Sequence, residues 1–359
     1  MELFAANKQW STRPADERFA SLQALYDATK HYADIAKEKR MPFADLRVEN
    51  VDGDVQLVGK AGVPAKLTHW AFGQLCARLE APASYLRDLP ATLACQNLNY
   101  GLAARLQNGA ANAVANLMFH ENGGLLLRSI VTDDYSRIWN YEVAERLLGL
   151  QEQGWTPAMP DIRCTEDDFP ALYASDHDMF AFLRNSDLTV TERGSDGAVY
   201  KGVIVQNSEV GASALKLTRF LYREMCGNHI IWGASKVVEI SVRHAGNARS
   251  KWSQYFAAVR RYAEESTSDL EAQIAASKVR VIGATKEDVL DALFGKRIPG
   301  LTRKAIDAGY DAVDVAQDGP RNTVWGMVQG LTRYSQTIKY ADGRTELDRA
   351  AGKLMEATF

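Results

Sequence analysis

Residues 46–57 read LRVENVDGDVQL, and this stretch sets the expected fold class. Its apolar residues alternate with polar ones on both sides of Asp52-Gly53: Leu46, Val48, Val55 and Leu57. An Asp-Gly pair between alternating segments is a strong β-hairpin signal, because a two-residue turn needs positive φ angles that Asp and Gly tolerate. The stretch therefore predicts two antiparallel strands joined by a tight turn.

Similar signals recur along the chain. The segments that flank Asn122-Gly123-Gly124 and Ser195-Asp196-Gly197 predict two more hairpins, and residues 215–225 and 229–232 are expected to form further strands. Thr68 and Asn140 are expected to cap helices that follow the first two hairpins. Hairpins that alternate with single helices are typical of an α+β fold with an antiparallel sheet, not of a parallel βαβ fold.

The last third of the chain has a helical pattern. Apolar residues at helical spacing from Trp252 to Val259 predict a helix that extends to Lys278. Thr285 is expected to cap another helix, and Pro320 to precede a third. We therefore expect an N-terminal arm or helix (residues 1–40), an α+β core domain (41–249) and a helical C-terminal region (250–359).

Composition limits the class of protein. No apolar run approaches the roughly 18 residues of a membrane helix, and the N-terminus does not resemble a signal peptide. The sequence therefore predicts a cytoplasmic protein with no membrane partner. The four cysteines lie far apart, with no C-x-x-C pair, and are expected to be buried apolar groups and not zinc ligands.

Motifs of the common enzyme classes are missing from the sequence. The glycines at 295 and 300 have phosphate-loop spacing, but Leu301-Thr302 replaces the Lys-Ser/Thr that would hold phosphate and magnesium. No G-x-G-x-x-G, G-x-S-x-G or H-E-x-x-H is present. We expect no cofactor, and a binding protein rather than an enzyme.

One acidic stretch offers an enzymatic alternative. Glu166, Asp167 and Asp168 precede Asp176-His177-Asp178, and such side chains could hold Mg²⁺ or Mn²⁺ for phosphodiester hydrolysis. The competing interpretation is a solvated loop in which Asp176 caps a helix that buries Met179, Phe180 and Phe182. Asp176, His177 and Asp178 are thus weak metal candidates.

Positive charge is concentrated in one segment. Residues 201–261 contain ten Lys or Arg and three Glu, a net charge of +7, which leaves −10 for the rest of a chain whose net charge is −3. Such asymmetry is a reason to expect an anionic partner. The alternative is a solvated basic face without a partner.

Basic and aromatic residues interleave in this segment. Bases stack on exposed aromatic rings while Lys and Arg neutralise phosphates, so the pattern predicts a nucleic-acid interface. The alternative places the aromatic rings in the core. The candidate residues are Lys216, Arg219, Phe220, Tyr222, Arg223, Lys236, Arg243, Arg249, Lys251, Arg260 and Arg261.

The link Asn207–Ser213, with the sequence NSEVGAS, is small and polar. Its backbone N–H groups could cradle a phosphate. It could equally form a turn that needs a glycine at position 211 for its backbone angles.

Several stretches resemble a family of phage- and plasmid-borne proteins, domain of unknown function 932. They are WSTRP at 10–14 with ERF at 17–19, NSEVGAS at 207–213, FLYR at 220–223, CGNHIIWG at 226–233 and RHAG at 243–246. The likeness covers most of residues 10–260 and more weakly the helical tail. It implies a mobile element as source, but no reaction and no site.

We therefore expect a nucleic-acid-binding protein that acts on single-stranded DNA in recombination or replication. An analogy with ring-forming annealing proteins, at the level of fold alone, favours a homo-oligomer. The alternatives are a metal-dependent enzyme acting on nucleic acid and a protein-interaction factor directed at host defence.

Overall fold

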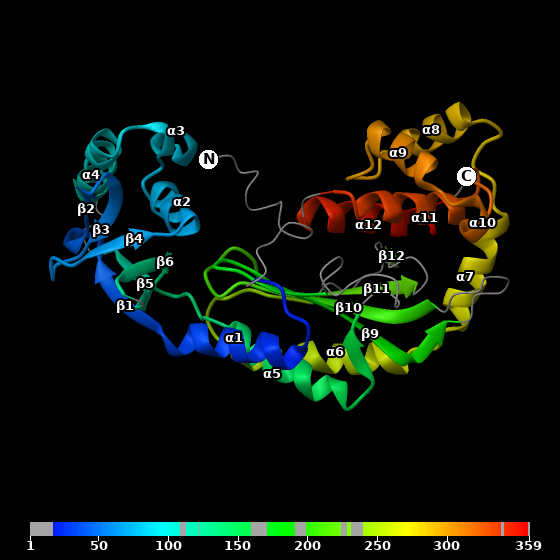
Figure 1. Cartoon of the computed structure of the whole chain (residues 1–359), viewed down its shortest axis with the longest axis horizontal. Coiled ribbons are helices and arrows are strands. Elements are labelled where there is room, and N and C mark those ends of the chain that lie inside the picture. The colour runs from blue at the N-terminus through cyan, green and yellow to red at the C-terminus, as the bar shows by residue number, and fades with distance from the viewer. Residues whose placement is uncertain are drawn as a thin grey trace.

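A computed structural model describes residues 17–107, 113–121, 123–158, 171–190, 199–223, 228–230, 240–338 and 341–357. The fold is α+β, as predicted, with mostly antiparallel strands followed by helices. The described strands form two sheets, where the sequence had suggested one (Figure 1). Each sheet has its own hydrophobic core.

The first sheet contains six strands within the described residues, in the order β1-β5-β6-β4-β3-β2. The strands are β1 (Ala36–Pro42), β2 (Arg47–Val51), β3 (Asp54–Val58), β4 (Pro64–Leu67), β5 (Val114–Glu121) and β6 (Leu125–Thr132). Asp52 and Gly53 have φ angles of 54° and 87°, which confirms the predicted hairpin turn between β2 and β3. The β4–β6 pairing is parallel.

Three helices cover the first sheet: α2 (His69–Arg78), α3 (Ala83–Asp88) and α4 (Ala91–Gln107). Thr68 caps α2 as predicted, because its side chain accepts the backbone N–H of Ala71. Cys76 and Cys95 are buried free thiols in this core, whereas Cys164 and Cys226 lie outside the described residues.

The second sheet contains seven strands within the described residues. They are β7 (Trp155–Pro157), β8 (Leu172–Ala174), β9 (Met179–Val190), β10 (Val199–Asn207), β11 (Leu215–Arg223), β12 (Asn228–Ile230) and β13 (Ile240–Val242). Strands β9, β10 and β11 form an antiparallel centre, as the third hairpin signal predicts, although the turn at 195–197 lies outside the described residues.

Helices lie on both sides of the second sheet (Figure 1). One face packs on α1 (Leu22–Asp34), α5 (Asn140–Gln151) and α6 (Trp252–Glu264), which share a core with β9, β10 and β11. A separate helical layer shares another core with Val190, Val199 and Leu221 of the sheet. This layer consists of α7 (Ser268–Val279), α8 (Lys286–Gly295), α9 (Arg303–Ala312), α10 (Val315–Asp318), α11 (Val324–Ser335) and α12 (Ala341–Leu354).

Three local expectations are corrected. The helix predicted from Trp252 to Lys278 is two helices, because the backbone at Glu265 is extended. Residues after Asp178 form strand β9 and not a capped helix, although Met179, Phe180 and Phe182 are buried as expected. Trp139, not Asn140, occupies the N-cap position of α5, so Asn140 is the first residue of that helix.

No helix in the described ranges is both long enough and apolar enough to cross a membrane.

The crossing of α9 and α11 depends on two glycines. A Cβ at Gly330 would lie 2.1 Å from the carbonyl oxygen of Gly309, so we expect Gly330→Ala to lower the free energy of unfolding by about 1–3 kcal/mol through overpacking. Gly149→Ala in α5 is the matched control, because its Cβ would meet no atom within 4 Å. The control should stabilise slightly, since Ala has the higher helix propensity. Equal melting temperatures for the two variants would contradict this packing.

Candidate functional site

The predicted basic segment divides into buried and exposed cations. Arg223 is 1% exposed, and its Nη1 lies 2.8 Å from Oδ1 of Asp318 while its Nη2 donates to the carbonyl of Gln317. Lys201, which contributes to the charge count, is also buried and donates from Nζ to the carbonyl of Tyr262 at 2.8 Å. Both side chains join the sheet to helices, and neither can reach a nucleic acid.

Phe220 and Tyr222 are both 0% exposed. They lie in a buried cluster on the second sheet, and the Phe220 ring meets Phe182 edge to face. A fully buried ring cannot stack on a base, so the interpretation of these two residues as a stacking surface is corrected. Strand β11 is buried on both faces: Leu215 and Leu217 pack in the core shared with α1, α5 and α6, and Phe220 and Tyr222 lie in a second cluster, which alternation alone does not reveal.

Arg219 and Lys216 are partly exposed. The Nη1 of Arg219 lies 2.9 Å from both carboxylate oxygens of Glu265, and its guanidinium lies over the ring of Tyr262. Lys216 is half-buried, and its backbone carbonyl accepts the hydroxyl of Tyr255. Arg219 is therefore already neutralised by an ion pair.

The remaining candidates lie in and just before α6. Arg243, Lys251, Arg260 and Arg261 are exposed, and none of them has an ion-pair partner among the described residues. Lys236 lies outside the described residues, as does the side chain of Arg249. Four of the eleven predicted residues thus remain as a described, exposed basic set, which we call the α6 cations.

The weak metal candidates form the turn between β8 and β9. Oγ of Ser175 donates to Oδ1 of Asp178 at 2.7 Å, and Nδ1 of His177 lies 2.7 Å from Oδ1 of Asp176. The His177 ring stacks on Trp70 of α2. The described part of the chain contains no group of three or more His, Cys, Asp and Glu that could hold a metal, and Glu166, Asp167 and Asp168 lie outside it.

The link between β10 and β11, residues 207–213, lies where the two sheets meet. Gly211 has a φ of +85°, and the backbone N–H of Ala212 donates to Oγ of Ser208 at 2.9 Å. The carbonyl of Val210 accepts from Trp70 and Gln74 of α2. The turn interpretation of this link is therefore supported, because the carbonyl of Val210 and the N–H of Ala212 bond to the protein itself.

A buried ion pair forms the centre of this junction. Nη1 of Arg128 on β6 lies 2.9 Å from Oε1 of Glu209, and the two side chains are 3% and 2% exposed. Oε2 of Glu209 accepts the backbone N–H of Asn140 at the start of α5. Nη1 of Arg128 also meets Nε2 of His120 at 3.0 Å, and its Nη2 donates to the carbonyl of Asp176. The pair links the first sheet, the second sheet and α5.

Further side chains surround the pair. Arg137 donates to the carbonyl of Glu209 and, from Nε, to Oε1 of Glu38 at 2.6 Å. The Tyr135 hydroxyl donates to the carbonyl of Ser208 at 3.1 Å and lies 2.9 Å from Nδ1 of His244. Arg128 and Glu209 are paired, whereas Nη2 of Arg137 and Nε2 of His244 are buried without a hydrogen-bond partner among the described residues; we interpret the arrangement as a structural junction.

Burial controls ionisation at the junction. Desolvation, with Arg128 nearby, lowers the pKa of His120 to about 3, and desolvation with Arg137 nearby lowers the pKa of His244 to about 4. Burial also raises the pKa of the Tyr135 hydroxyl. Both histidines are therefore neutral at pH 7, and Nε2 of His120 can accept a hydrogen bond from Arg128.

Sequence reasoning missed Arg128, Arg137, Tyr135 and the role of Glu209. Most of their partners are distant in the sequence: four of the bonds described above join residues 69 to 109 positions apart. The compact polar link at 207–213 was the only local signal.

The two histidines predict a loss of stability in acid. Above pH 6.5 neither the folded nor the unfolded state is protonated at these rings, whereas below it only the unfolded state takes up the protons. The free energy of unfolding should therefore fall between pH 6.5 and about 4, by up to about 1.4 kcal/mol per pH unit for each ring. His120→Gln retains an acceptor for Arg128 and should make that slope shallower in denaturant titrations. An unchanged slope would contradict the buried neutral state of His120.

The comparisons with known proteins concern the same part of the chain. A family described as a domain of unknown function, DUF932, matches residues 128–355, which begins at Arg128 and includes the second sheet and the helical layer. The stretch at 10–19 that entered the expected likeness is outside the match. No match was found among curated proteins or among solved structures. Since the match covers well over half of the 359 residues, the chain belongs to the DUF932 family.

Proposed function

We propose that this protein is a component of a mobile element and binds nucleic acid. Single-stranded DNA is the ligand that we expect it to bind. The observation that carries the proposal is the set of α6 cations, which are exposed and have no ion-pair partner among the described residues. Residues 240–264 contain five Lys or Arg and a single Glu, so positive charge is concentrated in and just before this helix.

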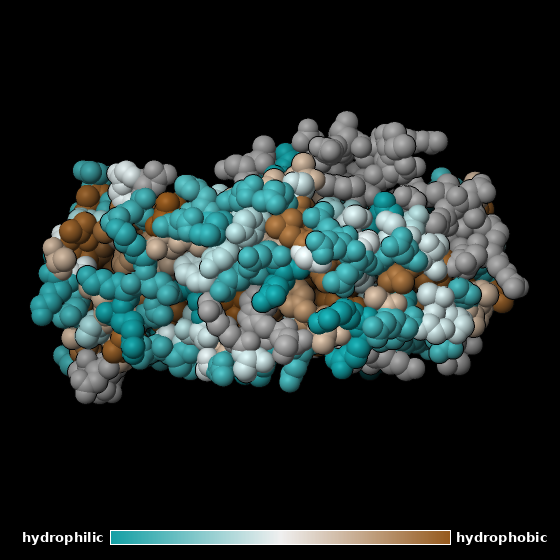
Figure 2. All heavy atoms as spheres, turned by 90° about the horizontal axis from the view of Figure 1, so that it is seen from below, coloured by the Kyte–Doolittle hydropathy of each residue, from teal (hydrophilic) through white to brown (hydrophobic). Residues whose placement is uncertain are grey.

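The location of α6 fits such a role. It lies with α1 and α5 along one long side of the molecule (Figure 1). Figure 2 views the molecule from that side, which is largely hydrophilic with scattered apolar residues. Tyr255, Ala258, Val259 and Tyr262 anchor the opposite face of α6 in the core. Arg260 and Arg261 are therefore held on a fixed element, which limits the entropy lost when they bind phosphates, and Lys251 directly precedes it.

The mode of binding differs from the one that the sequence suggested. Because Phe220 and Tyr222 are buried, they cannot stack on bases. Contacts from the α6 cations would be made to phosphates, which predicts binding with little sequence preference and a strong dependence on salt.

Substitution of the α6 cations tests the proposal. We expect the combined change of Arg243, Lys251, Arg260 and Arg261 to Ala to weaken binding to a single-stranded oligonucleotide. The slope of log affinity against log salt should become shallower by about 3, since each phosphate contact on a single strand contributes about 0.7. Fluorescence anisotropy over a salt series measures both quantities, and circular dichroism checks the fold.

The matched control removes four exposed cations from other parts of the molecule: Lys60, Arg297, Lys304 and Arg321. It changes the net charge by the same amount and should retain most of the binding. Equal losses in both variants would indicate attraction by net charge alone and would refute an interface at α6. Failure of the parent protein to bind single- or double-stranded DNA at low salt would refute the proposal altogether.

A further inference from the structure

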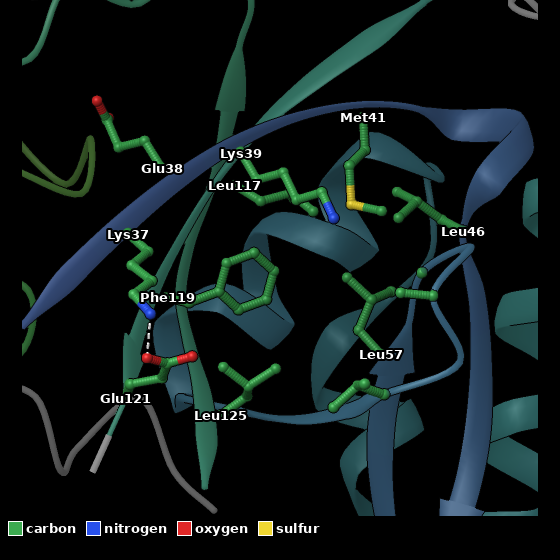
Figure 3. Close-up of a pocket in the computed structure, with 13 residues that line it drawn as sticks. Lys37, Glu38, Lys39, Met41, Leu46, Leu57, Leu117, Phe119, Glu121 and Leu125 are labelled. Carbon is green, nitrogen blue, oxygen red and sulfur yellow. Dashed lines mark hydrogen bonds and ion pairs between the residues drawn. The ribbon is translucent and has the colours of Figure 1, made fainter.

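The first sheet contains an apolar pocket that lies apart from the α6 cations. Its volume is about 340 Å³, within the range of small-molecule sites. Most of its wall is apolar (Figure 3), and the main contributors are Met41, Leu46, Leu57, Leu117, Phe119 and Leu125. An open cavity lined in this way favours the apolar part of a ligand, because binding removes apolar surface from water.

Curvature of the sheet creates the pocket. Strands β1 and β3 are not neighbours in the strand order, yet Met41 of β1 and Leu57 of β3 both line the cavity. Gly59, just after β3, lies against the end of the Met41 side chain, since a Cβ there would lie 2.3 Å from Cε of Met41. The wall is thus built into the fold by residues from four strands and the loop that follows β3.

The charged residues at the rim of the pocket differ in whether they have an ion-pair partner. Lys37 forms an ion pair with Glu121, and Glu38 forms one with Arg137, so these charges are neutralised. Lys39 lines the pocket, is exposed and has no ion-pair partner among the described residues. Figure 3 shows its side chain extending across the pocket toward Met41 and Leu46. A single uncompensated ammonium group therefore lies beside an apolar cavity.

We propose that this pocket binds a small amphipathic anion, with its apolar body against Phe119 and Leu125 and its anionic head on Lys39. A cation would be opposed by Lys39, and a neutral apolar molecule would gain nothing from it. The volume suits a short acyl chain or one aromatic ring. The site is separate from the nucleic-acid interface, so either proposal can fail without the other.

Isothermal titration calorimetry with octanoate, 1-octanol and octylamine tests the assignment. The three probes share an apolar chain and differ in the charge of the head. We expect octanoate to bind at least tenfold more tightly than octylamine, with 1-octanol between them. Absence of octanoate binding, or equal affinities for octanoate and octylamine, would overturn the proposal.

Three variants locate the binding. Lys39→Gln should reduce octanoate affinity to that of 1-octanol, whereas Lys60→Gln, at an exposed lysine that does not line the pocket, should leave it unchanged. Ala61→Trp places a large ring at an exposed lining position and should abolish binding of all three probes while the melting temperature is retained. Undiminished octanoate binding by folded Lys39→Gln or Ala61→Trp would show that the site lies elsewhere.

Discussion

The guanidinium of Arg128 and the carboxylate of Glu209 meet at 2.9 Å where the two sheets join, and both are almost completely removed from water. The free energy lost by desolvating two charges is large, and it is offset only where geometry and further hydrogen bonds are good. Here His120, the carbonyl of Asp176 and the backbone N–H of Asn140 supply those bonds. The position of one sheet relative to the other therefore depends on this pair.

The same principle joins the helical layer to the second sheet. Arg223 at the end of β11 is paired with Asp318, which also accepts from Arg333 of α11. One acidic residue thus holds two arginines from different layers. These bonds keep Arg223 inside the protein, and among the described residues of the 201–261 segment the exposed Lys and Arg lie in α6 and between β13 and α6.

Local signals predicted the local structure well. The Asp52-Gly53 turn, the Thr68 cap and the Thr285 cap all follow from residue types and spacing, and the structure contains each of them. The division into two sheets could not be predicted, because it depends on pairing between distant strands such as β1 with β5. The burial of Arg223 and Tyr222 was also hidden, because an interleaved basic and aromatic strand has the same pattern in a core and on a surface. Among the α6 cations, Arg260 and Arg261 were the part of the predicted interface that a sequence could identify, since their exposure follows from the polar face of one amphipathic helix.

A double-mutant cycle on Arg128 and Glu209 tests the account of the junction most directly. The variants Arg128→Met, Glu209→Met and their combination would be compared by denaturant unfolding. Each single change leaves one buried charge without its partner and should cost about 3–5 kcal/mol. The double change removes both charges. It should therefore lower the free energy of unfolding by at least about 2 kcal/mol less than the sum of the two single changes, a coupling energy near the upper end for contacting residues. Additive effects within about 0.5 kcal/mol would contradict the claim that this ion pair joins the two sheets.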